Sequence, residues 1–469
     1  MTTYIMKFGG TSVGSIEAMQ QAAKIIKSCA DQGHRLVVVV SAMRGVTDAL
    51  IQSAKSAAAG DEAAYKSIIE QLRDRHHGVL DGLSLNEHEN SPLLSIIDQH
   101  MDELSVFCRS IHVMGEVTPR GMDAITSLGE RLNARIFSTA LRQVGLNSQA
   151  VNATELIITD TAFQNAMPIM DITRQQLTKR LLPLLDDGVV PVVTGFIGAT
   201  QDGIITTLGR GGSDYTAAIL GAGLNADEVW TWTDVDGVMT ADPRIVPNAQ
   251  VIPEISFNEI SELAYFGAKV LHPKTIRPII ERDIPLWVKN TFNPSHPGTR
   301  ICIMPAKSKG KVTAISTVSD LSMITVEGRG MLGVPGIAAR TFAAVARTGA
   351  SVLMISQASS EQSISFLIPA DSTTEVIQSV ESEMSLELTR RDIDRIWAQD
   401  GVTIVTVVGA SLRTTPGIAA QIFSALAGGA INVIAIAQGS SEYSISLVVS
   451  EQDANDAMQR IHDKVILNA

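Results

Sequence analysis

The stretch "MKFGGTSVGS", residues 6–15, places Lys7 at the end of a short apolar run and follows it at once with glycines and hydroxyl residues. The run is typical of a buried strand, and a strand, a glycine turn and a helix in this order leave unpaired backbone N–H groups at the helix start. The helix dipole favours an anion at the same place. The stretch therefore predicts a phosphate site, or more simply a capped helix start beside a solvated lysine.

The residues after Lys7 offer groups that suit a phosphate. Gly9 and Gly10 let the backbone approach closely, while Thr11 and Ser12 can cap the helix or donate hydrogen bonds. In a Walker A loop the lysine follows its glycines, whereas here it precedes them. This order disfavours the P-loop fold.

Short β-rich runs alternate with helical stretches from Tyr4 to about Pro305, among them "RLVVVVSAM", "GVVPVVTGFIG" and "DEVWTWTDVDG". Continuous apolar runs are typical of strands covered on both faces in a mostly parallel sheet. We therefore expect a three-layer α/β domain whose ligands bind at the carboxyl ends of the strands. Residues 49–118 instead carry apolar residues at helical spacing, which predicts a helical insertion.

The composition is that of a folded globular protein, with 45% apolar and 18% charged residues among 469. This length suggests two or three domains. The net charge of −12 argues against general binding to nucleic acid or to anionic membranes. Because no apolar run approaches the ~20 residues of a membrane span and no apolar leader precedes Lys7, we expect neither membrane insertion nor export.

The cysteines and histidines give no sign of a metal site. Cys29, Cys108 and Cys302 stand far apart without a CxxC pair, so we expect neither a disulfide framework nor zinc. The adjacent His76 and His77 would point to different sides of a helix. We predict no protein-held metal and a reducing compartment, the cytoplasm.

Three further motifs follow predicted strands. "TTLGRGGSDYTA" (206–217) is a second glycine-rich turn, "TWTDVDGVMTADPR" (231–244) is an acidic turn, and "YFGAKVLHPKT" (265–275) carries Lys269. Singly, each fits an ordinary helix cap, turn or solvated lysine. Together with Lys7 they supply the cations and glycine turns that position and neutralise phosphates in phosphoryl transfer. A carboxylate acceptor is already ionised at neutral pH and would need no histidine base.

The region after about Lys307 contains an ungapped repeat. "PGIAARTFAAVARTGASVLMISQASSEQSIS" begins at Pro335, and "PGIAAQIFSALAGGAINVIAIAQGSSEYSIS" begins 81 positions later at Pro416. Each copy has the pattern strand, Gly/Pro turn, helix, strand, hairpin, strand. We expect two small α+β modules that arose by duplication.

As a set, these motifs resemble the aspartate kinases, an amino-acid-kinase domain followed by two ACT domains. The motifs "KFGGTSVG", "SAMRGVTD", "SLGERLN", "VVTGFIG", "TTLGRGGSDYTA", "TDVDGVMTADPR" and "FGAKVLHPKT" follow that family's order over residues 4–275. The resemblance implies a kinase domain over 1–305, a first ACT domain with its preceding strand over 306–396, and a second over 397–469. It also implies that ATP with Mg²⁺ phosphorylates the side-chain carboxylate of L-aspartate to 4-phospho-L-aspartate, the first step toward lysine, threonine and methionine.

The resemblance carries the family's site residues onto three groups of positions. The catalytic group is Lys7, which stabilises the transferred phosphoryl group, and Asp214. The substrate-binding group is Ser41, Thr47, Glu130 for the ammonium and Arg210 for the α-carboxylate. The nucleotide-binding group is Gly9, Gly10, Ser12, Gly211, Gly212, Ser213, Thr233, Asp234, Asp242, Arg244 and Lys269. Three positions depart from the family's pattern, namely Asp48, Asn133 and Met239.

The repeated modules resemble ACT domains, which bind amino acids and regulate. The matching effector positions are Met331, Gly336, Ile337, Ser351, Val352, Gln357, Asn432 and Gln438. "ISQASSE" and "IAQGSSE" are most similar to the threonine-sensing kinases, including the kinase half of the fused aspartate kinase–homoserine dehydrogenases, with lysine as the second candidate effector. The strand near "KVTAISTV" is expected to complete the second module. Paired modules imply a homodimer or homotetramer, and dimerisation could also be their sole role.

Two other functions are compatible with the sequence. The chain could phosphorylate another amino acid or a carbamate-type acceptor, since this fold hosts several acceptors. It could also be an amino-acid-binding regulator with an inactive kinase domain. Glu130 with Arg210 suits the two charged groups of an amino acid, and the presence of Lys7 and Asp214 disfavours the inactive form. Because the sequence ends at Ala469, we expect no dehydrogenase half.

Overall fold

The computed structural model describes residues 2–83, 87–267, 271, 273–305, 312–331, 334–358, 362–438 and 442–467. Contacts divide the chain into two compact units, which we describe separately. The first comprises Met1–Val238, Val251–Phe257 and Val270–Pro305, and the second comprises Met239–Gln250, Asn258–Lys269 and Ala306–Ala469.

The first unit is built on an eight-stranded sheet of order β3-β5-β2-β1-β8-β10-β11-β9. Its strands are β1 (Thr3–Phe8), β2 (Arg35–Val40), β3 (Ser148–Val151), β5 (Val190–Thr194), β8 (Glu228–Thr233), β9 (Glu254–Ser256), β10 (Leu286–Asn290) and β11 (Thr299–Cys302). All neighbouring strands run parallel except β10 and β11. The predicted α/β class is confirmed, because the valine-rich runs are buried on both faces as their continuous apolar pattern required.

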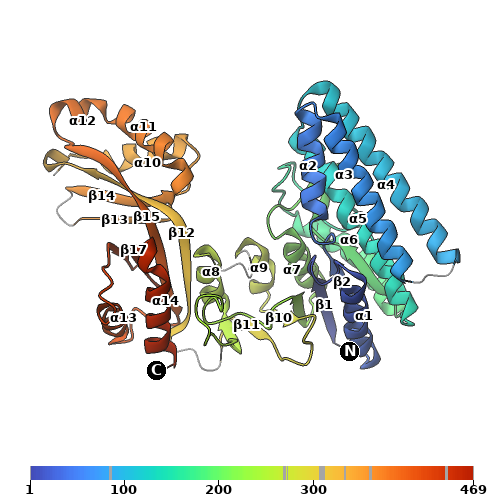
Figure 1. Ribbon diagram of the computed structural model, residues 1–469. Helices are drawn as coiled ribbons and strands as arrows, with labels where there is room; N and C mark the ends of the chain where they lie inside the picture. Colours follow the sequence, from blue (N-terminus) through green and yellow to red (C-terminus); the bar gives the residue numbers. More distant parts are fainter. Residues whose placement is uncertain are drawn as a thin grey trace. The chain divides into compact units, whose positions relative to one another are not determined.

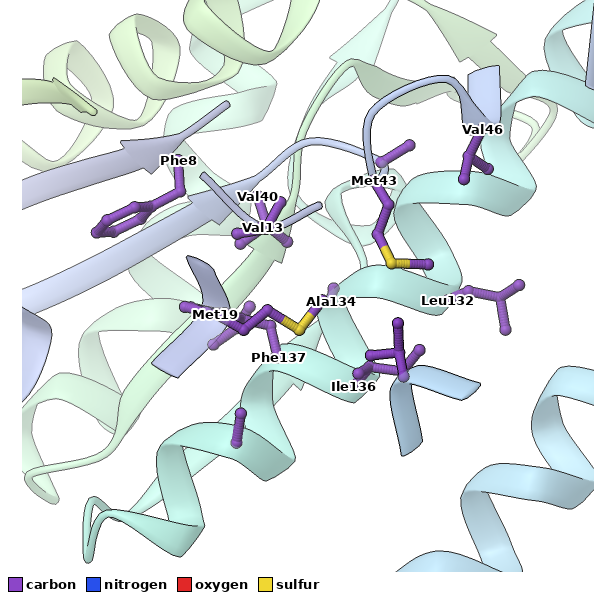
Figure 2. Packing of buried hydrophobic residues seen from close by; sticks show 14 of the residues in the cluster. Phe8, Val13, Met19, Val40, Met43, Val46, Leu132, Ala134, Ile136 and Phe137 are labelled. Atoms are coloured by element: carbon purple, nitrogen blue, oxygen red, sulfur yellow. The ribbon is translucent and has the colours of Figure 1, made fainter. Parts of the chain in front are cut away.

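Helices cover both faces of this sheet. They are α1 (Ile16–Asp31), α5 (Pro119–Gln143), α6 (Met170–Asp186), α7 (Gly212–Leu224) and α9 (Pro273–Ile280), and a small sheet β4-β6-β7 (Ile158–Thr159, Ile197–Thr200, Ile205–Thr207) and a 3₁₀ turn at Ala153–Glu155 complete the unit. On one face, Phe8 and Val40 pack with Met19 of α1 and Phe137 of α5 (Figure 2). On the other face, Gly221 lets α7 approach the sheet, since a Cβ there would lie 2.7 Å from the Val229 side chain.

The predicted helical insertion consists of α2 (Val46–Ala58), α3 (Glu62–Leu83) and α4 (Glu87–Met114), which pack side by side and against α5 (Figure 1). Within it, His76 is buried, its Nδ1 lies 2.6 Å from the Leu72 carbonyl oxygen, and burial lowers its pKa to about 4. The Nε2 atom of His77 instead lies 3.2 Å from Oδ1 of Asp98. Across the described residues, no helix is long and apolar enough to cross a membrane.

The second unit contains a six-stranded antiparallel sheet of order β13-β14-β12-β15-β17-β16. The strands are β12 (Val312–Glu327), β13 (Met354–Gln357), β14 (Ser363–Pro369), β15 (Arg395–Gly409), β16 (Ala435–Ala437) and β17 (Ser444–Ser450). The helices are α8 (Phe257–Tyr265), whose first residue belongs to the first unit, α10 (Ile337–Arg347), α11 (Thr373–Glu383), α12 (Ser385–Arg390), α13 (Ile418–Ala427) and α14 (Ala454–His462). Short turns of 3₁₀ helix at Arg329–Met331, Ala370–Ser372 and Glu451–Asp453 and of π-helix at Asp463–Leu467 complete it.

The repeat seen in the sequence is repeated in the structure. α13 begins 81 residues after α10, and β17 begins 81 residues after β14. The long strand β12 joins the two copies, because Leu321–Glu327 pairs with β14 while Val312–Val318 pairs with the end of β15, beside β17. The prediction that the strand before the first copy completes the second module is confirmed.

Two segments inside the range 1–305 make their contacts with the second unit. In the segment 239–250, Thr240 Oγ1 lies 2.9 Å from Nε2 of the buried His462 on α14, and the Thr240 carbonyl oxygen accepts a hydrogen bond from Ile315 on β12. In the segment 258–269, the Thr313 hydroxyl donates to Glu259. The two compact units therefore do not coincide with the predicted domains, because parts of the predicted kinase domain 1–305 belong to the second unit.

The core of the first unit gives a stability prediction. Phe137 is fully buried, with its ring centroid 6.0 Å from that of Phe8. We expect Phe137→Ala to lower the free energy of unfolding by about 3–5 kcal/mol, because it removes a large buried side chain and leaves a cavity. Urea unfolding followed by circular dichroism measures the change. Phe292→Ala, at a 53% exposed position, is the control and should differ little from wild type.

Candidate active site

A cavity of about 610 Å³ lies in the first unit, at the carboxyl ends of β1 and β2. Strand ends, the loop into α2, one face of α5 and the glycine turn into α7 supply its walls. Its lining residues are Lys7, Ser41, Thr47, Ile51, Lys55, Met122, Asp123, Thr126, Glu130, Gln164, Phe196, Thr207, Gly209, Arg210, Gly211, Gly212, Ser213 and Asp214. Both predicted catalytic residues and all four predicted substrate-binding residues are among them.

The two predicted catalytic residues form an ion pair. Lys7 Nζ lies 2.8 Å from Asp214 Oδ1, although the two residues are separated by about two hundred positions in the sequence. Lys7 is on β1 and Asp214 is in the first turn of α7, and the Lys7 residue is only 8% exposed. The Thr231 hydroxyl of β8 donates a longer hydrogen bond of 3.4 Å to the same carboxylate oxygen. The Asp214 carboxylate therefore holds the Lys7 ammonium in position at the cavity wall.

The first glycine turn passes close to the loop after β2. A Cβ on Gly10 would lie 2.9 Å from the Ala42 carbonyl oxygen, so no larger residue fits without a backbone shift. Ser12 is fully buried, and its hydroxyl donates to the Trp232 carbonyl oxygen while accepting from Thr291. The hydroxyl that caps α1 is that of Ser15. Ser12 thus connects the turn after β1 to β8 and to the residue that follows β10, a role that its position in the motif does not reveal.

The second glycine turn has the conformation that its glycines permit. Gly209 and Gly211 have φ of 79° and 71°, in the left-handed region that glycine adopts without a steric penalty. Between them, Arg210 is exposed to solvent. The turn therefore presents the Arg210 guanidinium at the cavity beside the N-terminus of α7.

Glu130 on α5 is a buried carboxylate with one free oxygen. Its Oε1 accepts a hydrogen bond from the Ala42 N–H, and its buried Oε2 has no partner among the described residues. Burial raises the pKa of Glu130 to about 8. One turn further along, the Asn133 amide donates to the Ser41 carbonyl oxygen at 2.5 Å, so both ends of the Ser41–Ala42 peptide are held by α5. This is the contact made by Asn133, one of the three departures from the family's pattern.

The predicted nucleotide-binding residues are not all brought together. Gly211, Gly212 and Ser213 line the cavity. Thr233 is the last residue of β8, and its hydroxyl donates to the carboxylate of Asp234, the next residue. Lys269 lies outside the described residues.

Two more of the predicted nucleotide residues are in the second unit. Asp242 and Arg244 form an ion pair there, and the guanidinium lowers the pKa of the Asp242 carboxyl. Their role stays a prediction.

Sequence reasoning missed several lining residues. Phe196 follows β5 with φ of 70°, a left-handed conformation that is uncommon for a side chain of this size. Asp123 precedes Glu130 by two helical turns, and this spacing places both carboxylates on one face of α5. That spacing was visible in the sequence, whereas the backbone conformation of Phe196 was not.

A second cavity of about 330 Å³ lies in the first of the repeated modules. Its lining residues are Met331, Val334, Pro335, Gly336, Ile337, Ala338, Gln357 and Ile364. Four predicted effector positions are therefore brought together at the turn before α10. Of the others, Val352 packs against the module's core, and Ser351, Asn432 and Gln438 are exposed.

The sequence matches two family models. Residues 2–290 match the amino acid kinase family, and residues 324–384 and 405–465 match the ACT domain. Aspartokinase 2 of Arabidopsis thaliana chloroplasts is 35% identical over 467 residues, covering 98% of this chain and 84% of that protein. The bifunctional aspartokinase/homoserine dehydrogenase 2 of the same plant is 36% identical and covers 99% of this chain and 51% of that protein. The chain spans about half the length of the bifunctional relatives that it matches.

Solved aspartokinase structures are also similar to this chain. Escherichia coli aspartokinase III in complex with aspartate and ADP (R-state) superposes with a TM-score of 0.82 at 30% identity, over 99% of both chains. The same enzyme with lysine and aspartate (T-state) gives 0.80. The chain belongs to the amino acid kinase family and, within it, to the aspartokinases.

Glu130 gives a test of the site's electrostatics. Its pKa is about 8 when folded and near 4.5 when unfolded, so only the unfolded state loses the proton between these values. Folding therefore favours the protonated carboxyl, and the free energy of unfolding falls as pH rises from about 4.5 to about 8 and then levels off. We expect Glu130→Gln to unfold at a higher temperature than wild type at pH 8.5, with the difference vanishing near pH 4.5.

Thermal unfolding across a pH series measures this difference. Glu70→Gln, whose carboxylate is exposed on α3, is the control and should follow wild type at every pH. A difference between Glu130→Gln and wild type that does not change with pH would contradict the raised pKa.

Proposed function

We propose that the chain transfers the γ-phosphoryl group of ATP to the side-chain carboxylate of L-aspartate, forming 4-phospho-L-aspartate and ADP. The observation that carries this proposal is the single cavity lined by Glu130, Arg210 and the Lys7–Asp214 pair. An amino acid with an acidic side chain needs one anion for its ammonium, one cation for its α-carboxylate and a route to the phosphate.

Aspartate would bind through Glu130, Arg210 and two hydroxyl groups of the cavity wall. The substrate ammonium meets the free Oε2 of Glu130 and favours its ionised form, so a proton is released when aspartate binds near neutral pH. Arg210 receives the α-carboxylate, and a guanidinium suits a carboxylate because two N–H groups can donate side by side. The hydroxyls of Ser41 and Thr47 line the same wall.

The transfer step needs positioning and charge neutralisation rather than a base. An oxygen of the aspartate side chain attacks the γ-phosphorus, and the bond from that phosphorus to the oxygen of ADP breaks. The attacking carboxylate carries no proton at neutral pH, so none has to be removed. Lys7 stabilises the charge that spreads over the transferred group, and Asp214 holds its ammonium in place.

Mg²⁺ would arrive with the nucleotide. Among the described residues no group of three or more potential protein ligands is gathered, and Mg²⁺ is commonly held by phosphates and water with one or two carboxylates. Asp214 is a carboxylate of the cavity that could contribute, and the ion would neutralise charge on the phosphates.

We also propose that an amino acid binds the cavity beside α10 and inhibits the kinase, with threonine preferred over lysine. Support comes from the polar Gln357, which faces a pocket otherwise made of apolar side chains and backbone. An amino acid shifts activity only by its difference in affinity between two states of the protein. Lysine is the alternative, since aspartokinase III has been solved with lysine.

The remaining predictions belong to the same proposal. The reaction would begin lysine, threonine and methionine synthesis, and the ACT modules would pair two chains into a dimer or tetramer. The cytoplasm is the compartment expected from the sequence, whereas the plant relatives are described as chloroplastic.

The reaction is tested by trapping the acyl phosphate with hydroxylamine in the presence of Mg-ATP. We expect aspartate-dependent product from wild type and a loss of at least 100-fold in kcat for Lys7→Ala, because the cation acts on the transferred group. Lys27→Ala, on the exposed side of α1, is the matched control and should retain wild-type activity. Folded protein that binds ATP but gives no product with aspartate would overturn the assignment and direct attention to other acceptors.

The effector site is tested in the same assay. We expect threonine to inhibit wild type and Gln357→Ala to need at least a tenfold higher threonine concentration for half inhibition, because the amide no longer contacts the effector. Gln378→Ala, exposed on α11, is the control. Inhibition of wild type by lysine alone would contradict the threonine preference.

A further inference from the structure

Asp123 is a buried carboxylate of the cavity wall to which no role has been assigned. It is 1% exposed and lies on the same face of α5 as Glu130. The two carboxylates differ in their partners, since Glu130 keeps a free oxygen, whereas both oxygens of Asp123 accept hydrogen bonds from the protein. A carboxylate whose acceptors are already occupied is suited to hold the structure around a substrate rather than to bind the substrate itself.

The donors to Asp123 come from two separate segments. Asp123 Oδ1 accepts from the Thr207 hydroxyl at 2.7 Å, and Oδ2 accepts from the Thr207 N–H at 3.0 Å. Oδ2 also accepts from the Gln164 N–H at 2.9 Å. Thr207 ends β7, whereas Gln164 is in the loop before α6. One side chain on α5 therefore joins the end of a strand to a loop.

The Gln164 backbone is in a strained conformation. Its φ is 68°, in the left-handed region that residues other than glycine seldom adopt. Strain of this kind persists where surrounding contacts hold it, and it occurs often near functional sites. The hydrogen bond from the Gln164 N–H to Asp123 is such a contact.

The two segments meet directly beside Arg210. A Cβ on Gly209 would lie 3.0 Å from the Gln164 carbonyl oxygen and 2.9 Å from the Asn165 side-chain oxygen, so the loop packs onto this glycine. Gly209 immediately precedes Arg210, and Thr207 lies three positions before it. By holding Thr207 and Gln164, Asp123 sets the position of the backbone from which the Arg210 guanidinium extends.

We propose that Asp123 is a positioning residue for Arg210 and thereby sets the affinity for the α-carboxylate of the amino-acid substrate. The inference deepens the proposed function and rests on it for the identity of the substrate. Asp123 itself does not touch the reacting atoms, and it acts through the turn 207–210.

The test is the variant Asp123→Asn, which keeps the size of the side chain but presents an amide N–H₂ where N–H groups now donate. We expect KM for aspartate to rise at least tenfold, with KM for ATP within twofold of wild type and kcat changed less than KM. A purely structural role would instead change all three parameters together and lower the unfolding temperature without this selectivity.

A double-mutant comparison shows whether the effect passes through Arg210. In an Arg210→Ala background, Asp123→Asn should raise KM for aspartate no further, because the group that it positions is absent. Additive losses in the two variants would overturn the proposal. If Asp123→Asn does not fold, Thr207→Val removes only the hydroxyl bond, and it should raise KM for aspartate more than Thr207→Ser, which keeps a hydroxyl.

A measurement independent of activity separates this inference from the proposed function. Arg210 is exposed, so brief trypsin digestion followed by mass spectrometry reports cleavage after it. We expect Asp123→Asn to speed this cleavage at least fivefold, while cleavage after the exposed Arg244 stays at the wild-type rate. Absence of aspartate phosphorylation in wild type would overturn the proposed function, whereas unchanged cleavage at Arg210 would overturn the positioning role.

Discussion

The parallel pairing of β1 between β2 and β8 is the constraint on which the active site depends. It places Lys7 in register with Val39 on one side and Thr231 on the other, at the edge of the sheet where the carboxyl ends meet. The loops that follow these strands therefore converge on one place. The ion pair between Lys7 and Asp214 then joins the central strand to α7, and the cavity is built around this pair.

Helix α5 supplies three side chains with different duties from one face. Asp123 is saturated by protein donors, Glu130 keeps one free oxygen, and Asn133 holds the Ser41 carbonyl oxygen. Burying a carboxylate with an unpaired oxygen is unfavourable, as the raised pKa of Glu130 reflects. The free oxygen of Glu130 can therefore bind a substrate ammonium, while the Asp123 carboxylate and the Asn133 N–H₂ group are bonded to the protein.

The second unit follows a different principle, because its stability rests on sharing strands. β12 and β15 each run through both repeated modules, so neither module has a complete sheet without the other. The same unit takes in the segment 239–250, through the contacts of Thr240 with His462 and Ile315. The segment 239–250 thus belongs to the second unit, although the residues before and after it in the sequence belong to the first.

The sequence by itself determined the α/β class, the helical insertion, the 81-residue repeat and the family, because strand hydrophobicity, helical spacing and glycine turns are local patterns. It also indicated Lys7, Glu130, Arg210 and Asp214, which the fold brings to one cavity. Only the tertiary structure decided that the Ser12 hydroxyl is committed to strand contacts, and that Asp123 bonds to Thr207 and Gln164. Those partners come from segments distant in the chain, and their pairing depends on how strands and loops meet rather than on any local pattern.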